Sequence, residues 1–450
     1  MTCRLATCVA VLFLLPAIAA GQSIPADRER LSLDAAIKMA VDNNRQLAAA
    51  RLQTEKAEED LAVARTHRLP AFETTVSASQ LLTPVDFSFP RAAFGDFPGI
   101  GPVPATDTSV STPRRLNTFL SSQVTQPLSQ LLRINLGIRT AAATRDIERE
   151  HAREQELSVV NSVKRLYFGI LQSESALAAS DEAIALYREL DRTLEVRVAQ
   201  KVALRSDALD VKVRLAQEEA TRLTHADTIA SQKEQLNQLL GRDVRTRFDT
   251  EGVAPMSALA VDLESVQARA LADRPDLKEA RLKVEQADLD RRMKRAERIP
   301  DISLAVSYVS NFNIDVLPRN IASAGVQLKW EPLDWGRRGR ELAAKSHVLS
   351  QARLAVREAE DRAVLDINAQ FRKMDEARAQ LNVAQAAQSA AREKLRVRTN
   401  QFQIQAAMLS DVMHTRADMA DSNDRFQQAL LAFWTAKADF ERAAGQTSTD

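Results

Sequence analysis

Hydrophobic residues recur every seven positions through most of this chain. This spacing is typical of long helices that pack along one narrow seam. Near the C-terminus, Val412, Met419, Phe426, Phe433 and Phe440 follow it. The pattern predicts helices over residues 32–69, 135–200, 206–240, 262–298, 337–402 and 407–444. The two longest contain no proline, and at about 1.5 Å per residue each would span on the order of 100 Å.

Four short segments between the helices alternate apolar and polar residues, which predicts strands with two different faces. They cover residues 71–82, 117–126, 301–310 and 321–331. Such strands fit either a soluble hairpin packed on helices or a membrane β-barrel with lipid outside and water inside. In a barrel, Trp330 and Trp335 would lie at the membrane interface. Bacterial barrels have at least about eight strands, so a four-stranded chain would have to share its barrel with other copies.

The order of helices and strands occurs twice. Arg51-Leu52 recurs as Arg281-Leu282 about 230 positions later, and Ser206-Asp207 recurs as Ser410-Asp411 after about 204 positions. A duplication of this size predicts two pseudo-symmetric halves, residues 21–250 and 251–450.

Residues 1–20 have the pattern of a secretory signal peptide. Arg4 precedes an apolar run that ends in small residues near Ala19. The only cysteines, Cys3 and Cys8, lie inside it, so we expect a mature chain without disulfides or thiolate metal ligands. No later segment contains 18 continuous apolar residues, which argues against a transmembrane helix. A secreted chain of this kind is either soluble or spans a membrane as a β-barrel.

Composition and charge narrow the function classes. Only 12 of 450 residues are glycine and aromatic residues make up 5%, which favours long helices. The formal net charge of +1 gives no support to a nucleic-acid partner. The five histidines have no metal-ligand spacing, and phosphate-loop, nucleophile-elbow and dinucleotide motifs are absent. We therefore expect neither catalysis, as in a secreted hydrolase, nor a cofactor or metal.

With these features the chain resembles the TolC-type outer-membrane efflux proteins. The resemblance rests on the opening motif Leu31 to Ala36, the duplication, and the junctions Gln126-Pro127-Leu128 and Glu331-Pro332-Leu333. It implies a mainly α fold with a small β part. A homotrimer would share a 12-stranded β-barrel in outer-membrane lipid and continue it as an α-barrel through the periplasm.

The resemblance also implies a function and its partners. The trimer would be the exit duct of a tripartite efflux or type I secretion system. It would dock on a periplasmic adaptor (a membrane fusion protein) and an inner-membrane transporter. The other interpretation is a periplasmic coiled-coil scaffold or adaptor without a barrel. The sequence does not indicate the cargo.

The same resemblance implies roles for two sets of residues, one at a periplasmic gate and one at the adaptor-docking turns. Asp411 would belong to an aspartate ring that closes the periplasmic gate, with His414 in place of the family's second acid. The adaptor-docking turns would contain Lys201, Ser206, Asp207, Gln405 and Ser410. Lys201 and Gln405 stand where the family commonly has glycine, which puts the choice of partner pump in doubt.

The gate residues also have a simpler interpretation. Asp411, His414, Asp418 and Asp421 share one helix face, and such a polar stripe is typical of a solvated surface. If the ring forms, close carboxylates would attract cations, and a histidine one turn away would add sensitivity to pH.

Overall fold

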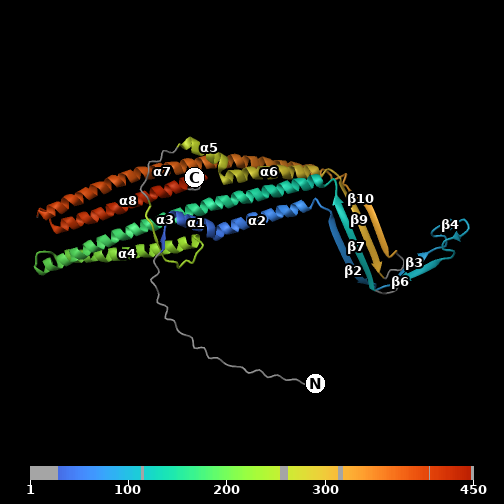
Figure 1. Ribbon diagram of the computed structural model, residues 1–450, viewed down its shortest axis with the longest axis horizontal. Helices are drawn as coiled ribbons and strands as arrows, with labels where there is room; N and C mark the ends of the chain where they lie inside the picture. The colour runs from blue at the N-terminus through green and yellow to red at the C-terminus, as the bar shows by residue number, and fades with distance from the viewer. Residues whose placement is uncertain (1–28, 113–115, 254–261, 313–317, 405, 447–450) are drawn as a thin grey trace, which may run out of the picture.

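The computed structural model describes residues 29–112, 116–253, 262–312, 318–404 and 406–446. The expected signal peptide, residues 1–20, and Gln405 lie outside the described residues. The described chain is elongated, with a body of long helices at one end and a four-stranded sheet at the other (Figure 1). Among the described residues, no helix is both long and apolar enough to cross a membrane.

Two helices run almost the whole length of the body: α3 (Leu131–Ala199) and α7 (Arg337–Gln403). Along one half of each lies a returning helix, α4 (Arg205–Leu239) on α3 and α8 (Leu409–Ala443) on α7. Along the other half lie α2 (Arg45–Thr66) and α6 (Pro275–Ala296). This three-helix arrangement therefore occurs twice, and α3 joins the two halves by packing on both α6 and α8.

The prediction of single helices over 32–69 and 262–298 was wrong, because each region is divided in two. Helix α1 (Leu33–Asn43) ends before α2, and α5 (Leu263–Asp273) ends before α6. Asn44 has an extended backbone, and its side-chain oxygen accepts the N–H groups of Gln46 and Leu47 at the start of α2. Arg274 precedes Pro275, and a residue before proline disfavours helical geometry.

The main hydrophobic core lies where α1 covers α3, α4 and α8. The first strand, β1 (Glu29–Leu31), pairs there in parallel with β8 (Phe248–Thr250). The buried Tyr167 hydroxyl lies 2.8 Å from the carbonyl oxygens of Leu31 and Glu251, so it ties both strands to α3. The sequence analysis did not foresee this pair of strands, because three-residue strands carry too little periodicity.

A buried ion pair reinforces the contact between the halves. Lys164 of α3 lies 2.6 Å from Glu441 of α8, with side chains only 7% and 19% exposed. Beside it, the Asn161 amide donates to Asp439 at 3.0 Å. Removing one partner of such a pair leaves an uncompensated charge in the interior, so the pair fixes how the two helices align.

The sheet has the order β10-β9-β7-β2, with all neighbours antiparallel. Its strands are β2 (Ala71–Gln80), β7 (Leu116–Pro127), β9 (Asp301–Phe312) and β10 (Asn320–Lys329). The strand ends thus differ by up to two residues from the expected ranges. The central pairing joins β7 of the first half to β9 of the second.

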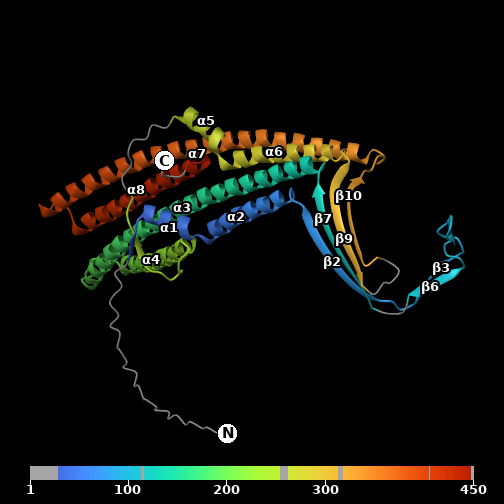
Figure 2. The same ribbon diagram turned by 45° about the vertical axis from the view of Figure 1, so that its right-hand side comes forward.

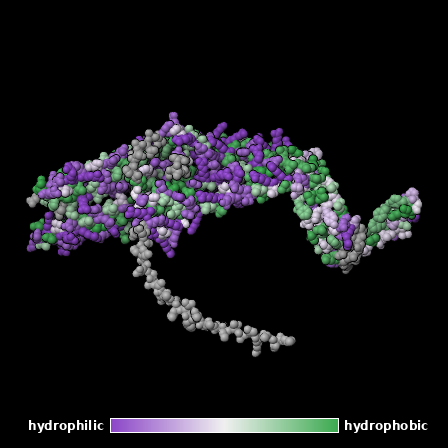
Figure 3. All heavy atoms as spheres, viewed as in Figure 1, coloured by the Kyte–Doolittle hydropathy of each residue, from purple (hydrophilic) through white to green (hydrophobic). Residues whose placement is uncertain are grey.

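The register gives the sheet two unlike faces. One face carries Phe72, Val76, Val124, Leu304, Val306, Val326 and Leu328. The opposite face carries mostly polar or small residues, among them Glu73, Thr75, Gln123, Ser307, Ser323 and Gln327. Hydrophobic residues gather over the sheet and the ribbon beyond it, whereas the helical body is mostly hydrophilic on the face in view (Figure 3).

Between β2 and β7 the chain extends into two short antiparallel ribbons. Strand β3 (Val85–Phe89) pairs with β6 (Thr108–Thr112), and β4 (Asp96–Phe97) pairs with β5 (Gly101–Pro102). These ribbons project beyond the sheet at the far end from the helices (Figure 2). The rings of Phe89 and Phe94 contact each other with centroids 5.3 Å apart.

Candidate functional sites at the helix tips, the strand junctions and the sheet edges

The turn between α3 and α4 forms one tip of the helical body, far from the sheet. Lys201 lies in this turn with φ of 62°, in the left-handed region that glycine favours. Its neighbours are apolar but exposed, since Val202 keeps 70% and Leu204 68% of its surface accessible. The second tip, between α7 and α8, exposes Ile404 at 76% and Met408 at 65%.

The structure places Ser206 and Asp207 in the first turn of α4 rather than in the turn itself. The Ser206 hydroxyl lies 3.3 Å from the Asp207 carboxylate. A carboxylate at this position interacts favourably with the positive end of the helix dipole. Ser410 lies at the corresponding position in α8.

Asp411 and His414 are both exposed on the first turns of α8. The Asp411 carboxylate accepts the backbone N–H of Met408 at 3.1 Å, which caps the helix. Farther along the same face, Asp418 lies 3.3 Å from Lys394, and Asp421 lies 2.9 Å from Arg425. Within one chain, the acids of this stripe therefore have local partners, and a gate would require assembly of several copies.

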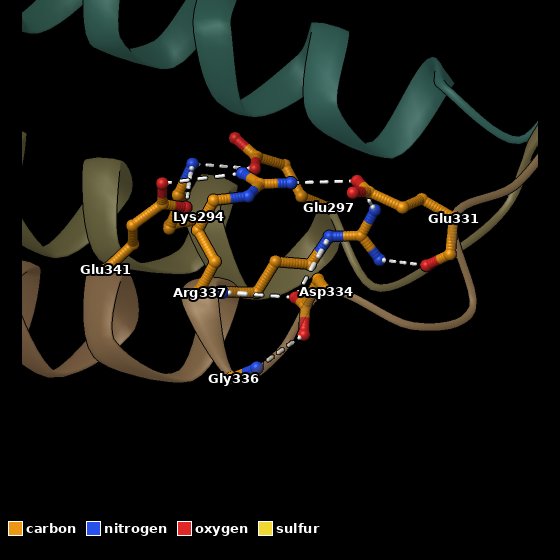
Figure 4. Close-up of polar contacts among 8 residues, drawn as sticks. Lys294, Glu297, Glu331, Asp334, Gly336, Arg337 and Glu341 are labelled. Atoms are coloured by element: carbon orange, nitrogen blue, oxygen red, sulfur yellow. Dashed lines mark hydrogen bonds and ion pairs between the residues drawn. The ribbon is translucent and has the colours of Figure 1, made fainter.

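A dense charge network occupies the junction between β10 and α7 (Figure 4). The Glu331 carboxylate accepts from Arg337 at 2.8 Å and from Arg338 at 3.0 Å. Asp334 accepts the backbone N–H of Gly336 at 3.0 Å and that of Arg338 at 3.1 Å, so it caps α7. The N–H of Arg338, helped by that of Gly336, holds the pKa of the Asp334 carboxyl below its usual value.

The network continues along α7 and α6. Lys294 of α6 lies 2.7 Å from Glu297 and 2.9 Å from Glu341 of α7. The ammonium of Lys294 lowers the pKa of the Glu341 carboxyl, with a further contribution from Arg337. Acids and bases alternate closely here, so the network holds α6 against the start of α7. The sequence analysis missed this cluster, although the charges around Glu331 and Arg337 are a visible signal.

The two tryptophans lie beside this network. Trp330 directly follows β10 and is 59% exposed, and Trp335 is 90% exposed with φ of 54°. Both therefore present their rings to the surroundings at the end of the sheet nearest the helices. This position matches the expected role at a membrane interface, which stays a prediction.

The equivalent junction of the first half uses fewer charges. The Ser129 hydroxyl donates to the Pro300 carbonyl at 2.6 Å and accepts the N–H of Ile302 at 2.8 Å. Arg133 in the first turn of α3 forms an ion pair with Asp301, the first residue of β9. These contacts fasten the start of α3 to the neighbouring strand of the second half.

The outer strands leave the sheet open on both sides. Among the described residues, β2 pairs only with β7, and β10 pairs only with β9. Every residue of β2 and of β10 is exposed. Two long unpaired edges on an amphipathic sheet are a template for pairing with further strands. No cluster of metal-ligating side chains occurs within the described ranges.

A family model described as outer membrane efflux protein matches residues 36–242 and 266–446. These ranges include almost all of both four-helix halves and the sheet. The chain therefore belongs to the outer membrane efflux protein family, as the resemblance predicted. Among curated protein sequences, none matches the chain significantly.

The fold is similar to several solved structures. A membrane protein from Pseudomonas aeruginosa shares 17% identity, with 93% of this chain and 91% of that chain covered and a TM-score of 0.74. The CmeC outer membrane channel of Campylobacter jejuni shares 15%, with 93% and 87% covered and a TM-score of 0.75. The open-state MtrE outer membrane channel of Neisseria gonorrhoeae shares 15%, with 92% and 89% covered and a TM-score of 0.71.

Proposed function

We propose that three copies of this chain form the outer-membrane exit duct of a tripartite efflux or type I secretion system. The observation that supports this best is the open four-stranded sheet with one apolar face and two unpaired edges. An edge left open in lipid costs several kcal/mol for each unsatisfied backbone group, so closure is required. Three copies would supply twelve strands, with the apolar face toward lipid and the polar face toward water.

The helical body would form the periplasmic part of the duct. Helix α3 contains 69 residues, which corresponds to about 100 Å at 1.5 Å per residue. A soluble domain of this size has no need of such a length, whereas a conduit across a wide aqueous compartment does. Passive conduction requires no bond-making residue, and the energy for transport would come from the inner-membrane transporter.

The two helix tips would dock on a periplasmic adaptor. The exposed Val202 and Leu204 of one tip and Ile404 and Met408 of the other offer apolar surface for adaptor hairpins. The neighbouring Lys201, Ser206, Asp207, Gln405 and Ser410 would complete the docking turns.

Asp411 would form the gate where α8 helices of three copies converge, with His414 one turn away. In single-channel recordings from pH 8 to pH 5, Asp411→Ala should reduce the preference for cations, because a ring of carboxylates attracts them. Asp207→Ala is the matched control, since Asp207 occupies the equivalent position in the first half. Unchanged ion selectivity in Asp411→Ala would reject the gate.

Extraction and mass measurement test the whole proposal. The mature protein should require detergent, have the mass of a trimer, migrate differently before and after heating, and conduct ions in planar bilayers. The competing function is a periplasmic scaffold or adaptor. A monomer that is released without detergent and does not conduct ions would favour that alternative and reject the proposed duct.

A further inference from the structure

The sheet contains an internal template for its contact with a second copy. Strand β9 repeats β2, and β10 repeats β7, because Ala71 pairs with Thr125 in one hairpin and Asp301 with Lys329 in the other. The pairing of β7 with β9 inside the chain is therefore the model for pairing β10 with β2 of the partner subunit.

Applying the register of β7 and β9 to β10 and the partner's β2 shows which residues would lie opposite each other. Inside the chain, Gln123 lies opposite Ser307. The equivalent pair across the seam is Gln327 and Ser77 of the partner subunit. The same register places Leu328 opposite Val76 of the partner subunit on the apolar face. A slip of one residue would bring polar residues onto the apolar face, so the match of both faces supports this register.

We call the pairing of β7 with β9 the internal seam, and the pairing of β10 with β2 of the partner subunit the external seam. The ion pair at the internal seam has no direct equivalent at the external seam. Inside the chain, Arg133 pairs with Asp301. The junction motifs make Arg338 the equivalent of Arg133, but the residue equivalent to Asp301 is Ala71, which carries no charge. Glu73 lies two residues farther on the same polar face, about 7 Å along the strand. Within the described ranges, the side chain of Glu73 makes no hydrogen bond or ion pair.

Glu73 also meets a second carboxylate in this register. Pro127 lies opposite Ser303 inside the chain. Glu331 follows the end of β10 by two residues, so continuing the register past Lys329 would bring it close to Glu73 of the partner subunit. Like charges directly opposite each other in a sheet are destabilising. Arg337 and Arg338 both donate to a single oxygen of Glu331, which places two positive charges beside this position.

We propose that Arg337 and Arg338 hold Glu73 of the partner subunit at each seam, as the counterpart of the internal pair between Arg133 and Asp301. The ion pair is shifted by one pleat along the strand, because Ala71 replaces the aspartate. This inference rests on the proposed assembly of several copies. It assigns the charge network at the start of α7 a second role, the recognition of another copy of this chain.

Cysteine pairs test the register. The sequence has cysteines only at Cys3 and Cys8, inside the expected signal peptide, so an introduced pair would stand alone in the mature chain. Gln327→Cys with Ser77→Cys should link copies into dimers and trimers on non-reducing gels. Gln327→Cys with Thr75→Cys or Ser79→Cys should link far less, because diagonal positions exceed the reach of a disulfide.

The internal pair Gln123→Cys with Ser307→Cys is the positive control and should link within one chain without raising its mass. Equal linking from Thr75→Cys or Ser79→Cys would overturn the proposed register. A wild-type protein that forms no trimer would instead refute the proposed function itself, so the two failures are distinguishable.

Charge removal tests the ion pair. Glu73→Gln should reduce the fraction of trimer that survives mild heating in detergent by about tenfold, because three seams lose the contact together. Asp86→Asn removes a strand carboxylate outside the seam and should leave that fraction unchanged. In a background of Arg337→Gln and Arg338→Gln, Glu73→Gln should cause no further loss.

The other role of a charge on a free edge is to prevent unwanted strand pairing. In that case Glu73→Gln would aggregate without weakening the trimer that forms. An undiminished fraction of heat-resistant trimer, or losses that multiply in the combined variant, would overturn the pairing of Glu73 with the two arginines.

Discussion

The two halves of the chain both contain a break between two helices, and they stabilise this break with different side chains. In each half, a short helix breaks before a longer one, and the residue at the break bonds to the last turn of the returning helix. Asn44 donates to the Leu239 carbonyl at 2.8 Å, and Arg274 donates to the Ala443 carbonyl at 2.7 Å. The geometry is repeated, whereas the chemistry of the contact is not.

The difference shows how one side chain's tasks can be divided among three. Asn44 both caps α2 with its oxygen and bridges to α4 with its amide. In the second half Arg274 provides the bridge and also donates to the Asp276 carboxylate, but it does not cap α6. Asp276 accepts the N–H of Leu277 at 3.0 Å, and Pro275 fixes the backbone at the break. The duplication therefore retained the break itself, and each half stabilises it with its own set of bonds.

The largest expected difference concerns the glycines that end α4 and α8, which both have positive φ. A Cβ at Gly241 would lie 2.1 Å from the Asn43 carbonyl oxygen, whereas at Gly445 it would lie 3.2 Å from the Cγ atom of the Arg274 side chain. Gly241→Ala should lower the free energy of unfolding by about 4 kcal/mol and Gly445→Ala by about 1 kcal/mol. Thermal unfolding followed by circular dichroism measures both. Equal losses would show that the two contacts do not differ as described.

A smaller effect isolates the two tasks of Asn44. Asn44→Ala removes the cap and leaves the part-buried Leu239 carbonyl without its partner, so it should cost about 2 kcal/mol. Asn44→Asp keeps the acceptor for the N–H groups of Gln46 and Leu47 and loses only the bridge. It should therefore cost about half as much, measured by chemical denaturation in detergent. If Asn44→Asp matches wild type, the bridge contributes nothing.

The smallest effect is a pH dependence at the break of the second half, which a glutamate of the first half approaches. Glu154 of α3 faces the break at Arg274, and burial, together with the charge of Asp276, raises the pKa of its carboxyl above 4.5. The folded state thus binds this proton more tightly than the unfolded chain, so stability rises as pH falls through the folded pKa toward 4.5. Glu154→Gln should be more stable than wild type at pH 7 by less than about 1 kcal/mol, since partial exposure screens the effect.

The control for this prediction is Glu358, which occupies the equivalent position on α7. Its side chain is 64% exposed and pairs with Arg362 one turn away. Glu358→Gln should not reproduce the gain at pH 7 or its disappearance near pH 4. A gain that persists at low pH in Glu154→Gln would indicate a cause other than titration.

The long helices and the strands were the features most accessible from sequence, because each shows many repeats of its own periodicity. The heptad spacing through Phe426, Phe433 and Phe440 corresponds to the hydrophobic core between α7 and α8. Family membership followed from the ordered set of weak motifs, although no single motif is specific.

Structural features that depend on a single residue, or on residues far apart in the chain, could not be predicted from the sequence. Asn44 is tolerated within a helical pattern, and its bond to the carbonyl of Leu239 joins residues far apart along the chain, which the local sequence does not reveal. The second break had a local signal in Pro275, which was overlooked. For the gate, the position of Asp411 on α8 was predictable, but its capping bond to Met408 depends on the local backbone. The charge network around Glu331 depends on the turn that brings Arg337 and Arg338 back toward it.

The open edges of β2 and β10 also bear on how the protein matures. The main hydrophobic core of the helical body lies within one copy. In the proposed assembly, its sheet would reach a satisfied state only when other copies arrive, so the final step would depend steeply on local concentration. Until then, the same exposed strands invite pairing with unrelated chains, which makes escort to the membrane by a chaperone advantageous.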